Sequence, residues 1–304
     1  MGASRVQVSL FGRAKKQKLW GTFVQAAARK TLLAKLCQDD QVDLRSAGAQ
    51  GGAFLLPPTQ KDHLMPNDHF LVAGRVRLRV PHPAHLGRRP PAGQAQQCGH
   101  RYVQTQTQCN GVLDSRGLHG LVCEVGGGVV HRHNRLRDWL AGLVRTLSGK
   151  TVAIEQYVPQ WDWVVRVRGA DTIERARLDV AFVNFHGQRV YLDVVVPTAG
   201  TTNPESARSR AARDGAAAAR AEDGKRVRYP GPELVPFAVE ALGRPGRAAV
   251  SFLRSLAPAE PEQRSAVLGS AWQSLSVLLQ TENAELLLSS AGSGGGGGRP
   301  RGSR

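Results

Sequence analysis

The sequence has 304 residues, with 41 Lys and Arg against 24 Asp and Glu, a formal net charge of +17 and a pI near 10.8. Four cysteines in a chain of this length exclude a small disulfide scaffold, and no apolar run approaches the ~18 residues of a membrane span. Nothing in the chain is therefore expected to span a membrane. The positive charge favours nucleic acid or an anionic membrane as the partner, with a basic protein of no special partner as the alternative. Of these we expect nucleic acid, with no membrane partner and no small-molecule substrate.

Residues 1–97 are predicted to form a basic N-terminal region that ends in a Pro-rich linker over residues 81–91. Before the linker, basic and apolar residues alternate within Phe70–Val80, and this period of two predicts an edge strand with a solvated arginine face. The first acidic residue is Asp39. An acid-poor stretch is also typical of organelle transit segments, so an organelle is the alternative to a nuclear location.

Residues 98–133 are predicted to form a zinc-knuckle-like segment, with the spacing Cys98-x10-Cys109-x9-His119-x3-Cys123. Thiolates and imidazoles suit zinc, and a closed set of four ligands supplies folding energy to a segment without a core. Cys98 is the weakest member, because ten intervening residues exceed the usual spacing of a close cysteine pair. The alternatives to it are His100, His131 and His133. Free thiols beside surface histidines are the alternative to metal binding.

One mixed α/β domain is expected over residues 134–258. Apolar residues at helical spacing predict a helix that Asn134 caps and Gly149 ends. The elements expected after it are strands at Val152–Val158, Arg177–Phe185 and Arg189–Val196, a helix from about Pro204 to Asp223, a strand at Leu234–Leu242 and a helix at Arg247–Leu256. Residues 259–291 are predicted to form a C-terminal helical segment, and residues 292–304 are a Gly- and Arg-rich tail that we expect to be disordered.

Two aspartates lie on the second and third of these strands. If the strands pair as a hairpin about His186, Asp179 and Asp193 are directly opposed, with Cβ atoms about 4.5 to 5.5 Å apart. Both share a strand face with apolar residues, where an unpaired carboxylate is costly and a cation is expected. Oxygen ligands at this spacing suit Mg²⁺. An exposed hairpin face with two solvated aspartates is the alternative.

The hairpin segments Arg177-Leu178-Asp179-Val180 and Leu192-Asp193-Val194-Val195 resemble the core of the PD-(D/E)XK nucleases, which have the restriction-endonuclease-like fold. The order of the Cys and His segment, the stretch Val129–Asn134, the hairpin and the stretch Lys225–Tyr229 resembles the C-terminal region of site-specific non-LTR retrotransposons. This resemblance implies an α/β fold in which a mixed sheet is flanked by helices and preceded by a small zinc knuckle. We find no reverse-transcriptase active-site motif.

The motif departs from the usual pattern at two positions. Leu178 stands where proline is usual, and Val195 stands where the lysine of Asp-x-Lys is usual. In the retrotransposon enzymes that the chain resembles, the lysine lies on the next helix in a Lys-x-x-Lys-Tyr pattern. Lys225 matches the first lysine, Arg228 the second and Tyr229 the tyrosine.

The resemblance implies a Mg²⁺-dependent DNA endonuclease that nicks its target. Asp179 and Asp193 would hold the ion, Glu155 would be a third acidic group, and Lys225 would stabilise the transition state. The residues expected to contact nucleic acid are Arg228, Tyr229 and Arg132, with packing as the alternative role of Tyr229. The partner is DNA, with RNA as an alternative. The competing hypotheses are a non-catalytic nucleic-acid-binding protein and a degenerate retroelement relic.

Overall fold

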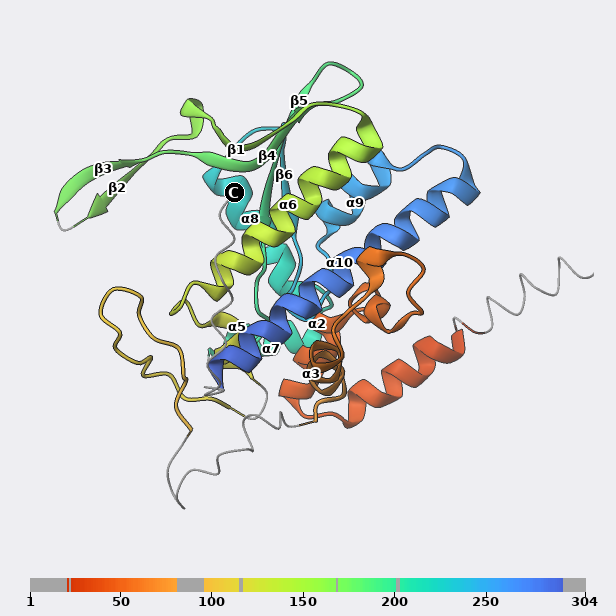
Figure 1. The fold of residues 1–304 in the computed structure, drawn as a ribbon. Coiled ribbons are helices and arrows are strands. Elements are labelled where there is room, and N and C mark those ends of the chain that lie inside the picture. The colour runs from red at the N-terminus through yellow and green to blue at the C-terminus, as the bar shows by residue number, and fades with distance from the viewer. Residues whose placement is uncertain are drawn as a thin grey trace, which may run out of the picture.

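The computed structural model describes residues 21, 23–80, 96–114, 117–167, 169–200 and 203–291. The expected Pro-rich linker and C-terminal tail lie outside the described residues. Figure 1 shows a central sheet with helices packed around it. Within the described part of the chain, no helix has both the length and the apolarity needed to cross a membrane.

The central sheet has four strands in the order β1-β4-β5-β6. They are β1 (Val152–Tyr157), β4 (Arg177–Val183), β5 (Arg189–Val195) and β6 (Leu234–Ala238). β4 pairs antiparallel with β1 and β5, whereas β6 pairs parallel with β5. Parallel neighbours need a crossover connection, which α7 (Pro204–Ala212) and α8 (Ala216–Arg228) provide. The mixed sheet flanked by helices is therefore confirmed.

The β4–β5 hairpin has the register that the sequence predicts. Val180 pairs with Leu192 and Val183 pairs with Arg189, so the hairpin turns about residue 186. Side chains alternate between the two faces of a strand. Val180 and Leu192 therefore enter the main core, whereas the aspartates next to them in sequence face the other way.

The main core lies between one face of the sheet and three helices, α6 (Gly128–Ser148), α9 (Arg247–Leu256) and α10 (Pro261–Ser290). In Figure 1, α6 crosses in front of the sheet with α10 beside it. A second cluster of buried side chains contains Ala181 and Tyr191 from the aspartate-bearing face, together with Tyr229. The aspartates therefore lie between two packed layers.

The N-terminal region packs on α10. It contains a helix over residues 23–35, and then α2 (Gln38–Ala47), the short 3₁₀ helices η1 (Gln50–Leu55) and η2 (Lys61–His63), and α3 (Asn67–Leu78). Phe54 of η1 packs with Val277 of α10, and α3 contributes Val72 to a cluster with Leu287. The N-terminal region and the C-terminal helical segment, which were predicted as separate parts of the chain, therefore pack against each other.

The edge strand predicted within Phe70–Val80 is wrong, because this segment forms α3. The alternation of arginine and apolar residues is short. α3 buries Val72 in one cluster and Ala73 in another, and Val76 packs partly against the cluster of Val72. This spacing of one, three and four residues is helical. Packing against α10 thus outweighs the local period of two.

Two predicted helices have different bounds. α6 begins at Gly128 and not at Asn134, so one helix crosses the predicted boundary between the knuckle segment and the α/β domain. The helix predicted from about Pro204 to Asp223 is divided into α7 and α8, because Gly215 between them has φ +70°, a left-handed conformation that glycine adopts without strain.

A two-stranded ribbon outside the central sheet was not predicted. After η3 (Pro159–Trp161), β2 (Trp163–Val167) pairs antiparallel with β3 (Ala170–Glu174). Figure 1 shows the ribbon projecting from the body of the molecule. It is inserted between β1 and β4, so its base leads directly into the strand that carries Asp179.

Candidate functional site

The first two predicted metal ligands lie on facing chain segments. Cys98 donates its backbone N–H to Gly111 O at 2.8 Å, and Cys109 donates its own to His100 O at 2.8 Å. The flanking bridge between Gln97 and Val112 continues this antiparallel pairing. The ten-residue gap is therefore closed by a hairpin, and it does not count against Cys98 as a ligand.

The other two ligands come from the short helix α5 (Leu118–Val122) and the residue after it. The carboxylate of Asp114 accepts the backbone N–H groups of Leu118 at 3.2 Å and His119 at 3.1 Å, which fixes the beginning of the helix. Cys123 follows the last residue of α5. One turn of helix thus brings His119 and Cys123 to the same side.

The four ligand atoms have the spacing of a tetrahedral site. All lie within 4.8 Å of one another. Cys98 Sγ is 3.8 Å and Cys109 Sγ is 3.7 Å from Cys123 Sγ, and Cys109 Sγ is 3.5 Å from His119 Nε2. Around a tetrahedral zinc ion with bonds of about 2.3 Å to sulfur and about 2.0 Å to nitrogen, these separations would be roughly 3.8 and 3.5 Å. The predicted set of four is thus confirmed as a group that could hold a metal ion.

Burial raises the pKa of two of these thiols. It raises the pKa of Cys98, and it raises the pKa of Cys123 to about 12, so both are thiols at neutral pH unless a cation binds. Metal binding would displace these protons, as metal coordination by cysteine requires. The backbone N–H of Gly111 lies 3.4 Å from Cys109 Sγ and would stabilise the thiolate.

Gly111 leaves the space that the His119 ring occupies, since a Cβ at this position would lie 1.9 Å from His119 Cε1. We expect Gly111→Ala to displace the imidazole and to lower the metal affinity by about 10- to 100-fold, the usual cost of disturbing a ligand's support. Competition with a coloured chelator measures this affinity. The control is Gly142→Ala on α6, where a Cβ meets no atom within 4 Å. Equal affinities of the two variants would contradict the arrangement.

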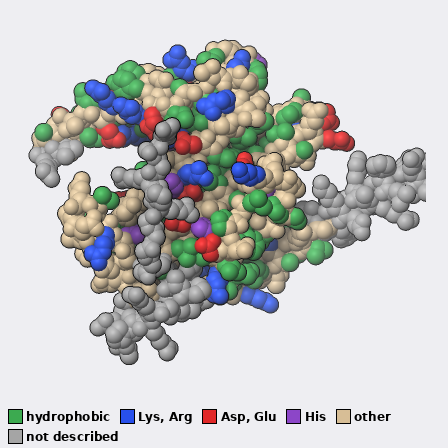
Figure 2. Space-filling view, in the orientation of Figure 1, with side chains coloured by type: hydrophobic (Ala, Val, Ile, Leu, Met, Phe, Trp, Pro, Cys, Tyr) green, Lys and Arg blue, Asp and Glu red, His purple; other side chains and the backbone are tan. Residues whose placement is uncertain are grey.

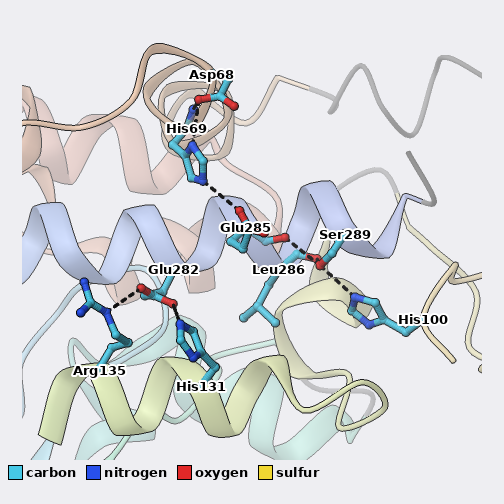
Figure 3. Close-up of polar contacts among 9 residues, drawn as sticks. All are labelled: Asp68, His69, His100, His131, Arg135, Glu282, Glu285, Leu286 and Ser289. Carbon is cyan, nitrogen blue, oxygen red and sulfur yellow. Dashed lines mark hydrogen bonds and ion pairs between the residues drawn. The ribbon is translucent and has the colours of Figure 1, made fainter. Parts of the chain in front are cut away.

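The three alternative histidines lie elsewhere. Figure 3 shows His100 bonded to Ser289 and His131 paired with Glu282, both residues of α10. The distances are 3.0 Å for His100 Nε2 to Ser289 Oγ and 3.5 Å for His131 Nε2 to Glu282 Oε2. His133 bonds to Asp179. None of the three belongs to the ligand group that the described residues form.

Asp179 is buried and held by two donors. His133 Nε2 lies 2.9 Å from its Oδ1, and the backbone N–H of Val194 donates to its Oδ2 at 2.6 Å. Burial opposes ionisation, but the hydrogen bond from His133 and the backbone N–H outweigh it and lower the pKa of Asp179. The same hydrogen bond raises the pKa of His133. Asp179 is thus a preorganised carboxylate.

Asp193 is equally buried, and its partner is Lys225. Nζ of Lys225 lies 2.7 Å from Asp193 Oδ2, so the two groups form a buried ion pair. Burial raises the pKa of Asp193 to about 6, against the opposing effect of Lys225. The carboxyl group of Asp179 also interacts with Asp193 and adds to the increase in pKa. Asp193 is thus a buried carboxyl group between a lysine and a second aspartate.

Buried glutamates fix the helix that carries Lys225. Ala218 of α8 donates its backbone N–H to Glu240 Oε1 at 3.0 Å, and Glu222 of α8 accepts the backbone N–H of Ala248 of α9 at 2.9 Å. Gly246 leaves room for this contact, because a Cβ there would lie 2.0 Å from Glu222 Oε1. Lys225 thus stands on a helix tied to both α9 and the end of β6.

The remaining predicted site residues are not at the acidic pair. Glu155 on β1 is half exposed, with 44% of its side chain accessible, and its Oε1 lies 2.5 Å from Arg137 Nη1. Arg228 lies 2.6 Å from Glu174 Oε1, and its guanidinium stacks over the rings of Trp163 and Tyr229. The structure thus brings together Asp179, Asp193 and Lys225 but places Glu155 beside an arginine.

Tyr229 and Arg132 are buried. The Tyr229 ring packs against Trp161 at 5.7 Å between ring centroids, which agrees with the packing role. Arg132 is only 4% exposed and donates from Nη1 to Asn283 Oδ1 at 2.8 Å. Burial lowers the pKa of Arg132 to about 10. Its placement disagrees with the expected phosphate contact, and it links α6 to α10 instead.

His133 is the site residue that the sequence prediction missed. Had the helix been extended back to Gly128, His133 would fall on the same helix face as Leu136 and Leu140, three and seven residues further on. That face packs on the sheet. Its position one helical turn before this buried apolar stripe was the sequence signal that His133 faces the sheet.

A scan against protein-family models and a search of curated proteins both find no match for this chain. The sequence resemblance to retrotransposon endonucleases thus stays a prediction.

Proposed function

We propose that the protein is a Mg²⁺-dependent endonuclease that nicks DNA by hydrolysing a phosphodiester. The observation that carries this proposal is the buried pair of Asp179 and Asp193 on neighbouring strands, with Lys225 at 2.7 Å from the second carboxylate. Paired carboxylates on neighbouring strands suit a hard divalent cation. The net charge of +17 suits a polyanionic substrate.

The residues present fit such an ion. Asp179 and Asp193 would hold it, and when bound it would lower the pKa of an attacking water and stabilise charge on the phosphate. His133 and the Val194 N–H hold the Asp179 carboxylate in one orientation. Lys225, 28% exposed, presents an ammonium group where the negative charge of the phosphate would grow.

The same proposal assigns zinc to the Cys98, Cys109, His119 and Cys123 group, with a structural role. Three sulfurs and one imidazole form a closed set that leaves no open position for a substrate, which is typical of structural zinc. The order of this group, the α6 segment, the hairpin and α8 is what supports a retrotransposon origin. A DNA partner, with RNA as an alternative, and a nuclear location belong to this proposal.

A non-catalytic nucleic-acid-binding protein is the second candidate. The observation that favours it is that each aspartate already has a cationic partner, His133 for Asp179 and Lys225 for Asp193. The pair is therefore charge-balanced without a metal ion. This candidate predicts DNA binding that weakens steeply with salt and has no requirement for a divalent cation.

Nicking of supercoiled plasmid separates the two candidates. We expect nicking with Mg²⁺ and none with EDTA, and we expect Lys225→Met to lower the nicking rate by about 100-fold, the typical cost of removing one transition-state donor. DNA affinity should change little. The matched control is Lys61→Met, because Lys61 is an exposed lysine of η2. DNA binding without Mg²⁺-dependent nicking would overturn the endonuclease proposal and favour the binding protein.

A further inference from the structure

Among the residues that the structure describes, the β2–β3 ribbon has no packing partner along most of its length. All of β3 is exposed, and the pairing from Trp163 with Glu174 to Val167 with Ala170 forms a sheet of its own. A two-stranded hairpin alone is marginally stable in water. A projecting ribbon of this kind is therefore suited to binding another molecule.

The surface of the ribbon combines apolar and basic side chains. Val164 is 62% and Ile173 is 65% exposed, and they are directly opposed on one face. Arg166 lies on the same face, with its side chain 79% exposed. Asp171 opposite is 4.0 Å away and equally exposed, a weak pairing. Figure 2 shows Lys or Arg side chains along the upper edge of the ribbon in this view.

The base of the ribbon is linked to α8, the helix that carries Lys225. Glu174 pairs with Arg228 at 2.6 Å, and the Arg228 guanidinium lies 5.8 Å from the centre of the Trp163 ring. Arg228 is three residues after Lys225 on α8, and β4 begins at Arg177, two residues before Asp179. The base of the ribbon and the proposed catalytic groups are therefore held by the same two elements, α8 and β4. This fixes the position of the ribbon relative to those groups.

Two further arginines lie at the base of the ribbon, between β3 and the beginning of β4. Arg175 and Arg177 are both exposed, and Arg175 lies over the Tyr157 ring at 5.8 Å. Together with Arg166 near the far end, they place guanidinium groups along the ribbon from its base outwards. Arginine in such a row contacts phosphates on a nucleic acid backbone.

From these observations we propose that the β2–β3 ribbon enters the major groove of double-stranded DNA and holds the duplex against the acidic pair. The inference rests on the proposed endonuclease function and names its substrate as a duplex. The major groove, about 12 Å wide, admits a two-stranded β-ribbon. Arg175 and Arg177 contact phosphates at the groove edge, and Val164 and Ile173 contact thymine methyl groups within it.

Binding to a short duplex, and to its single strand, tests the inference. The protein carries Asp179→Asn and the assay contains no Mg²⁺, so binding is measured apart from cleavage. We expect preference for the duplex, and we expect Arg166→Glu to weaken duplex binding by about tenfold and to lower the salt slope by about 1. Methyl green, which occupies the major groove, should compete, whereas the minor-groove ligand netropsin should not.

Arg254→Glu on α9 is the matched control, because this arginine is also exposed on a regular element. The double variant Val164→Ser and Ile173→Ser keeps the charge of the ribbon and should also weaken duplex binding. Equal losses with Arg254→Glu, competition by netropsin alone, or equal affinity for single strand would each overturn the inference. Duplex binding by the ribbon without any nicking of plasmid by the parent protein would leave the inference standing and reject the endonuclease.

Discussion

Asp179→Asn and Asp193→Asn are each expected to reduce Mg²⁺-dependent nicking by about 1,000-fold or more, because a bound metal contributes several kcal/mol of charge stabilisation and each ~1.4 kcal/mol is worth a factor of ten. Asparagine keeps the size of the side chain but removes the charge that would hold the cation. Both residues are buried, so the amide must also fit donors placed for a carboxylate. Initial rates on supercoiled plasmid measure the effect.

Asp223→Asn is the control for both variants. It lies on α8 close to Lys225, but its side chain is 77% exposed and its partner is the surface residue Arg226. We expect its nicking rate to match that of the parent protein, and circular dichroism should show that all the variants are folded. Nicking that survives both buried substitutions would reject the acidic pair as the catalytic site.

Cys109→Ser combined with Cys123→Ser is expected to abolish metal binding and to unfold the knuckle segment. Structural zinc supplies roughly 10 to 16 kcal/mol of apparent binding energy to isolated finger peptides at neutral pH. The segment's own core cluster is small and consists of three cysteines with Leu113 and Val125. Metal content per chain and hydrogen exchange over residues 96–123 are the measurements.

Cys37→Ser is the matched control, because Cys37 is an exposed thiol outside the group. It should retain the full metal content and the exchange protection of the parent protein. A double variant that still binds metal at the parent stoichiometry would contradict the assigned ligands. Loss of metal without loss of protection would instead mean that packing alone orders the segment.

The sequence predicted the parts that depend on local pattern. The hairpin register follows from alternating side chains around a short turn, and Asp179 and Asp193 meet because the register is fixed by burial of their neighbours. The ligand group with Cys98 follows from residue chemistry, although the hairpin that closes its long gap was not foreseen. The prediction of these features requires only residues that are near one another in the sequence.

The features that the sequence did not reveal depend on contacts between distant segments. α3 is a helix because its buried side chains meet α10, and the pairing of His133 with Asp179 exists only after α6 packs on the sheet. The burial of Arg132 depends in the same way on Asn283. Local spacing can place a side chain such as His133 on a buried helix face, but it does not specify the partner.

The position of α10 has a consequence for the order of folding during synthesis. Its Ser276 bonds to η1, its Asn283 to Arg132 and its Ser290 carbonyl to Gly99, so α10 contributes contacts to the N-terminal region, α6 and the knuckle. While a ribosome makes the chain, these earlier segments lack those contacts until α10 emerges. We therefore expect nascent chains that stop before residue 261 to expose apolar surface and to depend on chaperones.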